Sequence, residues 1–272
     1  MAEISKDSIC STLLDICPAI MDLSDEEILS GPSDLEVPFH RLDVLASLEV
    51  EDEAVESLLR DPGFRHVLEA VTRLRRVYSL RLEIEHARSI LDGPDPWETL
   101  KGFAFYPNYL TLARTEFENA DLKPGDRVVF LGSGPLPLSL IVLCRVHGLE
   151  GIGIEREPRW AELSRKVLEK LGLSNRIEIM TGDHFSTPLE KECKLVMVAA
   201  MAQPKDEIFD HLARVLPPGT KISYRIYEKG LRRLLDIDYS FSPPAKLQEH
   251  LRIRPEPPVN NTVVFLNANI FF

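Results

Sequence analysis

The sequence predicts a protein in two parts, a helical N-terminal half followed by an α/β half built on a parallel sheet. Few strand signals occur before about residue 115. From about Asp121 onward, short apolar strands alternate with amphipathic helices. Several of these strands are apolar throughout, which is typical of a parallel sheet covered by helices on both faces. We expect two domains, residues 1–115 and residues 116–272, with the boundary near residues 112–120.

Composition narrows the class of protein. The 272 residues are 44% hydrophobic and 28% charged, as in folded globular proteins, and the net charge is −11. This acidity argues against nucleic-acid or membrane partners, for which a basic patch is expected. No spanning helix or secretory signal is expected. The four cysteines form no CxxC pair, so we expect reduced thiols in a cytoplasmic protein and no metal site.

The helical half begins with a capped helix, because Ser24 precedes the acidic turn of DEEILS. A second helix is expected over residues 43–59. A long third helix is expected over residues 64–91, and Gly93 and Pro94 end it.

The second half alternates strands with helices. We expect one strand within each of the segments KPGDRVVFLGSG, GIGIERE, RIEIMTGDHF, CKLVMVAAM, TKISYRIY and NTVVFLNANIFF, with turns or loops at the ends of the first and third. The helices between them are expected at PLSLIVLCRVHG, RWAELSRKVLEKLG and KDEIFDHLARVLPPG. In such a fold, ligands bind at the carboxyl ends of the strands.

Three signals follow consecutive strands at that edge. Gly132 and Gly134 stand in LGSGP after the first strand and allow close backbone approach to a ligand. Glu155 ends the second strand, 21 residues beyond Gly134, where a carboxylate can bind a ribose diol. Asp183, in GDHF after the third strand, can hold an adenine amino group. Taken alone, the three signals could be a tight turn, a surface acid and another tight turn. Together, at the ends of consecutive strands, they favour a ligand site.

The spacing leaves NAD and S-adenosylmethionine open, and the acid followed by GD favours the latter. This is the arrangement of Rossmann-like class I methyltransferases, which is the fold predicted for the second half. The expected cofactor-binding residues are Gly132, Ser133, Gly134, Pro135, Leu136, Glu155, Asp183 and His184.

Two prolines distinguish this loop from the usual fingerprint. We expect Pro135 at the first helical position, where a missing amide hydrogen is harmless, with the helix dipole favouring the methionine carboxylate. Leu136 and Pro137 would then hold the methionine tail in an unusual pose. The alternative is a rigid helix start without chemical meaning.

The string GSGPLPLSLIVL resembles the signature of the nicotianamine synthase family, in its short archaeal form. The similarity runs from about Asp61 onward through PWETLKGFAFYPNYL, ELSRKVLEKLG, TGDHF, VMVAAMAQPK and VNNTVVF. It implies transfer of the 3-amino-3-carboxypropyl group of S-adenosylmethionine to an amine, with release of methylthioadenosine and no required metal. The amine would belong to an amino acid, such as glutamate or histidine, or to a second S-adenosylmethionine, and the product would be a metal chelator.

Three alternatives stay open. The related bacterial enzymes make a single aminobutanoyl transfer onto histidine for an opine metallophore. An ordinary small-molecule methyltransferase would use the same cofactor in another orientation. A sensor would bind S-adenosylmethionine without turnover.

Glu83 is the expected catalytic base. It shares a helix face with Ala87 and Ile90, whereas Glu85 lies about 200° around the helix and is expected in solvent. The resemblance implies catalytic roles for Glu83 and Tyr109, and the alternatives are a structural acid and a core aromatic residue.

The expected substrate-binding residues are Tyr106, Arg225, Asn260 and Asn261. Arg225 would pair with a substrate carboxylate. We expect residues 1–115 to form the acceptor site and a lid, and a homodimer is left open.

Overall fold

The computed structural model describes residues 6–31, 34–188, 192–228, 230–237, 241–254, 259 and 261–268. Two compact units are present, Met1–Leu82 with Tyr227–Ser240 and Glu83–Ile226 with Phe241–Phe272. The sequence changes character near residues 112–120, whereas the second unit already begins at Glu83. The reason is that helix α7 (Tyr106–Asn119) precedes the sheet in the chain but packs on helix α8 (Leu138–Val146) and on the sheet.

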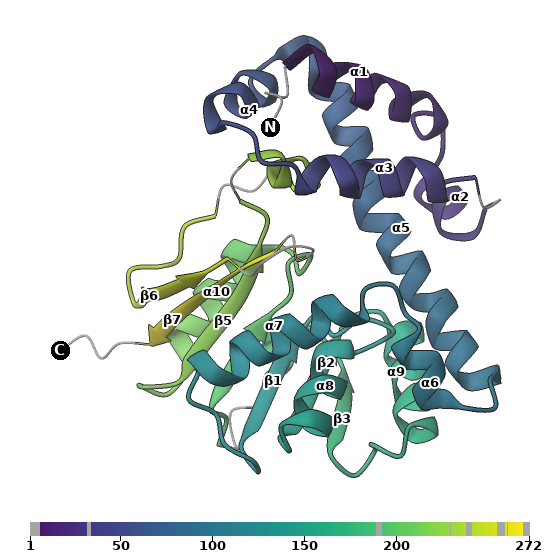
Figure 1. Ribbon diagram of the computed structural model, residues 1–272. Helices are drawn as coiled ribbons and strands as arrows, with labels where there is room; N and C mark the ends of the chain where they lie inside the picture. Colours follow the sequence, from purple (N-terminus) through teal and green to yellow (C-terminus); the bar gives the residue numbers. More distant parts are fainter. Residues whose placement is uncertain are drawn as a thin grey trace. The chain divides into compact units, whose positions relative to one another are not determined.

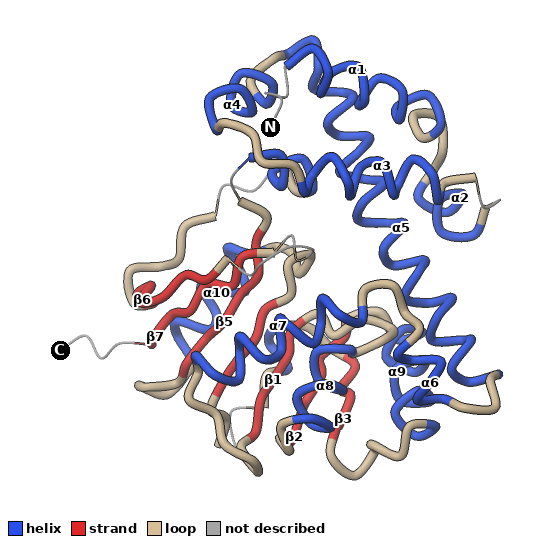
Figure 2. Tube along the Cα trace, viewed as in Figure 1, coloured by secondary structure: helices blue, strands red, loops and turns tan. Residues whose placement is uncertain are grey.

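The first unit is helical (Figures 1 and 2). It contains α1 (Lys6–Ile16), α2 (Asp25–Ser30), α3 (Glu36–Ser47), α4 (Asp52–Leu59), the beginning of α5 (Arg65–Asp92) and the 3-10 segment η4 (Gly230–Leu235). The capped helix predicted after Ser24 is α2. The Ser24 hydroxyl accepts from the amide of Glu27, and the Glu27 carboxylate accepts from the amide of Ser24 at 2.7 Å.

The single helix predicted over residues 43–59 is wrong. Helix α3 ends at Ser47 and α4 begins at Asp52, because Leu48 and Glu51 both adopt extended backbone angles. The acidic residues Asp52 and Glu53 then occupy the first turn of α4, where the helix dipole stabilises negative charge. The predicted long helix is α5, which runs one residue further than expected.

The second unit contains a seven-stranded sheet in the order β3-β2-β1-β4-β5-β7-β6. The strands are β1 (Arg127–Leu131), β2 (Glu150–Glu155), β3 (Ile177–Thr181), β4 (Leu195–Val198), β5 (Lys221–Ile226), β6 (Leu247–Ile253) and β7 (Thr262–Ala268). The first five are parallel, and β7 pairs antiparallel with β5 and with β6. This α/β architecture confirms the predicted fold class.

Helices cover the sheet on both faces. The unit includes α6 (Pro96–Lys101), α9 (Pro158–Lys170) and α10 (Lys205–Val215) besides α7 and α8. In Figure 1, α7 and α8 lie in front of the sheet and α10 lies behind it. Both-sided burial explains the continuous apolar runs of β1 and β4, whose residues Val128 to Leu131 and Leu195 to Val198 are all buried.

Strand β6 was not predicted. Its sequence, LQEHLRI, is polar, and its side chains are mostly exposed. A strand at the edge of a sheet needs no apolar face on both sides, so its sequence carries a weak signal.

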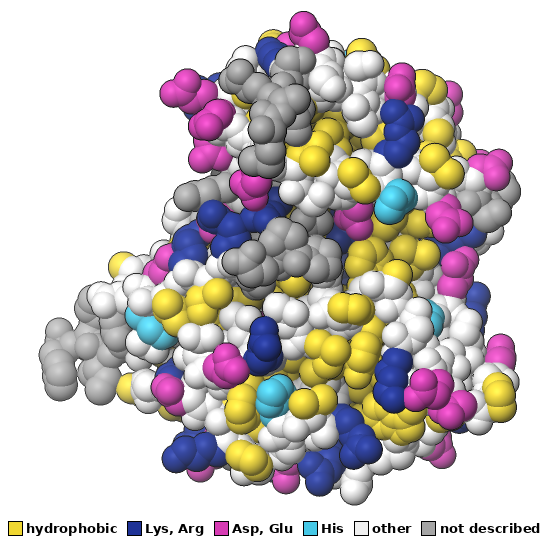
Figure 3. Space-filling view, viewed as in Figure 1, with side chains coloured by type: hydrophobic (Ala, Val, Ile, Leu, Met, Phe, Trp, Pro, Cys, Tyr) yellow, Lys and Arg dark blue, Asp and Glu magenta, His cyan; other side chains and the backbone are white. Residues whose placement is uncertain are grey.

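Among the described residues, no helix combines the length and apolarity needed to cross a bilayer. Figure 3 shows acidic and basic side chains intermixed with apolar ones over the face drawn.

Candidate functional site

The loop after β1 is shaped by two glycines. Gly132 and Gly134 have φ values of 78° and 70°, in the left-handed region that side chains disfavour. Gly132 also lies against the loop after β4, since a Cβ atom on it would sit 3.3 Å from the Cβ atoms of Ala199 and Ala202. A larger residue at position 132 would therefore meet both strain and crowding.

Glu155 connects this loop to the end of β2. Its Oε2 atom accepts a hydrogen bond from the amide of Gly134 at 3.0 Å, and its Oε1 atom accepts from the amide of Glu157 at 2.8 Å. A carboxylate offers about four acceptor positions. The half-buried Glu155 therefore braces the loop and keeps acceptor capacity for hydroxyl groups of a ligand.

The third signal follows β3. Asp183 is exposed, and its Oδ1 atom accepts from the amide of Phe185 at 2.9 Å, which caps a short 3-10 turn. The neighbouring His184 is buried, and its ring lies 4.1 Å from that of Phe185. Within the described structure, the His184 Nε2 atom and the Ser133 Oγ atom are buried without a hydrogen-bond partner. Buried polar atoms in folded proteins normally have partners, and a bound ligand at this edge of the sheet would supply them.

The prolines of the loop differ from the prediction. Helix α8 begins at Leu138 with Pro137 as its N-cap, so Pro135 lies in the loop and not at the first helical position. The physical reason is a tight turn, in which the Leu138 amide donates to the carbonyl of Leu136 at 2.8 Å. Leu136 is buried, so the two prolines flank a side chain anchored in the core.

Glu83 approaches the glycine loop from the C-terminal half of α5. The hydroxyl of Tyr109, on α7, donates to Glu83 Oε1 at 3.2 Å. A Cβ atom on Gly134 would lie 3.0 Å from Glu83 Oε2. The carboxylate is half-buried, while Glu85 is exposed. One carboxylate thus contacts a tyrosine hydroxyl and the loop that Glu155 braces, which is a suitable place for a proton acceptor.

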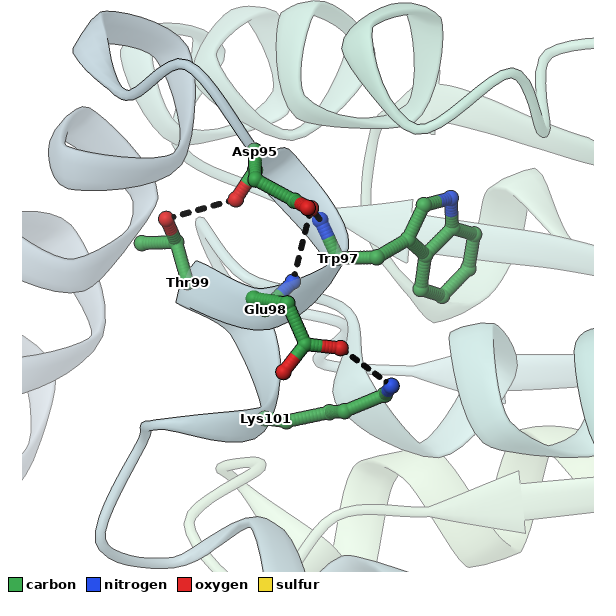
Figure 4. A network of polar contacts seen from close by, with 5 residues as sticks. All are labelled: Asp95, Trp97, Glu98, Thr99 and Lys101. Atoms are coloured by element: carbon green, nitrogen blue, oxygen red, sulfur yellow. Dashed lines mark hydrogen bonds and ion pairs between the residues drawn. The ribbon is translucent and has the colours of Figure 1, made fainter.

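Helix α6, formed by the PWETLK segment, is linked by a hydrogen bond to the part of α5 that bears Glu83. Figure 4 shows the polar contacts at its start. Asp95 caps α6 by accepting from the amides of Trp97 at 3.1 Å and Glu98 at 3.0 Å. His86, one turn after Glu83, donates from Nε2 to the carbonyl of Thr99 at 2.7 Å. Burial lowers the pKa of His86 below its ordinary value. The His86 hydrogen bond therefore links the segment of α5 that bears Glu83 to α6.

The four predicted substrate-binding residues fall in different settings. Tyr106 is half-buried as the first residue of α7, where Pro107 fits the second helical position. Asn261 has a buried Nδ2 atom with no partner in the described part of the chain. Asn260 lies outside the described residues. Arg225 is buried in a two-point ion pair with Glu116, at 3.0 and 2.7 Å, which favours a structural partner over a substrate carboxylate.

Two buried charged residues, Glu116 and Lys205, were not predicted from the sequence. Glu116 follows Tyr109 by seven residues and thus shares its helix face, a spacing that was visible in the sequence. Lys205 is buried, and its Nζ atom donates to the carbonyls of Ala200 at 2.5 Å and Ala202 at 3.1 Å. No local pattern predicts that contact, because it depends on how the chain turns after β4. Among the described residues, no group of three potential metal ligands occurs.

A family model described as "Nicotianamine synthase protein" matches residues 2–271. Nicotianamine synthase 3 of Oryza sativa subsp. indica is 30% identical over 159 residues, covering 53% of this chain and 46% of the rice protein. L-histidine 2-aminobutanoyltransferase of Yersinia pestis is 23% identical over 124 residues, covering 46% of each chain. The chain thus spans about half the length of these curated relatives.

A solved structure is similar over nearly the whole chain. It is the crystal structure of a glutamate-to-glutamine mutant of MtNAS in complex with S-adenosylmethionine. The TM-score is 0.83 at 29% identity, covering 96% of this chain and 98% of that one.

Proposed function

Because the chain belongs to the nicotianamine synthase family, we propose that it transfers the 3-amino-3-carboxypropyl group of S-adenosylmethionine to an amine. Methylthioadenosine leaves, and the product is a nicotianamine-like metal chelator. The observation that carries the proposal is the Glu83 carboxylate, which meets both the Tyr109 hydroxyl and the glycine loop after β1.

The residues at the carboxyl edge of the sheet fit S-adenosylmethionine. Glu155 retains acceptor capacity for a ribose diol after accepting two backbone amides. Asp183 is exposed in the next loop, where its carboxylate would meet the adenine amino group. The orphaned Ser133 Oγ and His184 Nε2 atoms would gain partners. The MtNAS structure, with that molecule bound, supports the same assignment.

The protein then has two chemical tasks. Bound S-adenosylmethionine supplies a sulfonium leaving group, so a carbon–nitrogen bond forms as the carbon–sulfur bond breaks and its electron pair leaves with sulfur. An α-amine is mostly protonated at neutral pH, and Glu83 would accept its proton. Tyr109 holds the carboxylate in place and would hydrogen-bond the amine. Alignment of the amine with the reacting carbon is the remaining contribution of the site.

The proposed division of roles follows from these positions. Glu83 and Tyr109 lie within residues 1–115, so this part of the chain would supply the acceptor site, and residues 116–272 would bind S-adenosylmethionine. We place the enzyme in the cytoplasm, which suits its four free cysteines, Cys10, Cys17, Cys144 and Cys193.

A second candidate is a single transfer onto histidine. The similarity to the Yersinia pestis aminobutanoyltransferase, at 23% identity, is the observation that supports this second candidate. The two candidates share the donor and the released nucleoside, and they differ in the acceptor and in the number of transfers.

Mass spectrometry of the released nucleoside tests the proposal. The purified chain is incubated with S-adenosylmethionine and with glutamate or histidine as acceptor. We expect methylthioadenosine, and the product mass then identifies the acceptor and counts the transfers. S-adenosylhomocysteine would instead mean methyl transfer. Tight binding of S-adenosylmethionine with no nucleoside released would favour the sensor and contradict the proposed enzyme.

A further inference from the structure

The Glu116–Arg225 ion pair is buried near the proposed site. The Arg225 and Glu116 side chains are 6% and 1% exposed. The guanidinium Nε and Nη2 atoms donate to the two carboxylate oxygens at 3.0 and 2.7 Å, so the pair is bidentate. A buried ion pair generally adds little stability over a well-packed apolar pair. Stability alone therefore does not explain the Glu116–Arg225 pair, and we looked for a functional role.

The location of Arg225 supplies that explanation. Arg225 is the penultimate residue of β5, so it lies at the edge of the sheet where β1 and β4 also end. Its guanidinium carbon lies 5.9 Å from the centroid of the Tyr109 ring and 5.4 Å from that of Phe130 on β1. Both distances fall in the range of cation–π attraction. The same guanidinium that pairs with Glu116 thus also contacts the proposed catalytic tyrosine.

The geometry of α7 connects these contacts. Tyr109 and Glu116 are seven residues apart, which is about two turns of one helix face. A single cation therefore holds α7 at two points, through the carboxylate of Glu116 and the ring of Tyr109. The hydroxyl of that ring reaches Glu83 at 3.2 Å.

We propose that Arg225, paired with Glu116, is a positioning residue that sets the place of the Tyr109 hydroxyl relative to Glu83. This rests on the proposed function and assigns Arg225 a role other than binding a substrate carboxylate. A substrate carboxylate would have to compete with a buried bidentate partner, and would leave Glu116 charged and unpaired in the core.

A double-mutant cycle tests this inference. The double replacement Glu116→Leu/Arg225→Met substitutes apolar side chains for both partners, so it leaves no buried charge alone. In an otherwise wild-type chain we expect kcat to fall at least tenfold. The Kd for S-adenosylmethionine, measured by calorimetry, should change less than threefold. In a Tyr109→Phe background the same replacement should change kcat less than threefold, because the hydroxyl it positions is already absent.

Two different results would contradict the positioning role of Arg225. An equal loss of kcat in both backgrounds would make the pair merely structural. An increase in the KM of the acceptor at constant kcat would restore the substrate-binding role of Arg225. If the apolar pair does not unfold cooperatively in urea, Arg225→Lys replaces it in the cycle, since lysine keeps the charge but loses the bidentate fork.

A readout without turnover separates this inference from the proposed function. In protein labelled with fluorotyrosine, the ¹⁹F signal of Tyr109 is assigned by its loss in the Tyr109→Phe variant. We expect the pair replacement to shift or broaden this signal, while the signal of Tyr78 in the other unit stays in place. An unchanged Tyr109 signal would overturn the inference. Absence of methylthioadenosine from the wild-type chain would overturn only the proposed function.

Discussion

At the scale of single residues, Glu83 shows how neighbours give a carboxylate a position. Glu83 and Glu85 are two positions apart on the same helix, yet only Glu83 meets Tyr109 and the loop at Gly134. Glu85 is exposed. Glu85 therefore serves as a control for Glu83, because the two side chains are identical and differ only in their position on the helix.

The prediction is that Glu83→Gln lowers kcat at least 100-fold, because an amide cannot accept the proton that the proposed reaction releases. Glutamine keeps the shape of the side chain, so the Kd for S-adenosylmethionine should stay within about threefold. The matched control is Glu85→Gln, for which we expect a kcat within twofold of the wild type. Release of methylthioadenosine measures all three proteins. If Glu83→Gln retained more than a third of the activity, Glu83 would not be the base.

At the scale of elements, the turn after β1 depends on backbone shape as much as on side chains. Gly134 and Gly172 both have φ of 70°. A Cβ atom on Gly134 would crowd Glu83 Oε2 at 3.0 Å. One on Gly172 would have no described neighbour within 4 Å beyond the adjoining residues. The two glycines share a left-handed backbone conformation and differ in what a side chain there would meet.

We therefore expect Gly134→Ala and Gly172→Ala each to lower the free energy of unfolding by about 1–2 kcal/mol, the strain of a left-handed alanine. Gly134→Ala alone should also lower kcat, by tenfold or more, because the new methyl group displaces the Glu83 carboxylate. Urea denaturation and methylthioadenosine release measure the two effects. Equal activity in the two variants would show that the contact between residues 134 and 83 has no part in turnover.

Helix α6 gives a second element with a local origin. Asp95 accepts two of its first amides (Figure 4). Pro96 suits its first turn. We expect Asp95→Ala to lower the free energy of unfolding by about 1 kcal/mol through loss of this cap. Asp95→Asn, which keeps a capping oxygen, should recover most of it in the same urea titration. A destabilisation by asparagine equal to that by alanine would contradict the capping explanation.

At the scale of the whole molecule, three histidines make stability depend on pH. Burial is the largest cause that lowers the pKa values of His86, His147 and His211 below their ordinary value of 6.5. As the pH falls below about 6.5, the unfolded chain takes up protons that the folded chain does not. The free energy of unfolding therefore decreases from that pH downward, toward the lowered folded-state values.

The expected outcome is a urea midpoint that is lower at pH 5.5 than at pH 7.5. A variant carrying His147→Gln and His211→Gln should show a smaller difference between the two pH values, because it lacks two of the three histidines with a lowered pKa. A midpoint that is unchanged or higher at pH 5.5 would contradict the sign of the linkage.

Local patterns in the sequence were sufficient for much of the fold. The helical run, the alternating strands and the fold class follow from periodicity and from turn residues, which depend on near neighbours. The residues at the strand ends, Gly132, Glu155 and Asp183, could be placed at one edge because the carboxyl ends of parallel strands meet there. Helical spacing also placed Glu83 on the buried face of α5.

Only the tertiary structure decided which distant residues meet. Glu83 approaches Gly134, and Arg225 pairs with Glu116, across long separations in the chain. The polar edge strand β6 could be identified only from its pairing with β7. The start of α8 at Leu138 was also settled by packing, since Leu136 is buried between the two prolines. The physical reason is that periodicity records which face of an element is buried, whereas the partner on that face depends on how all the elements pack together.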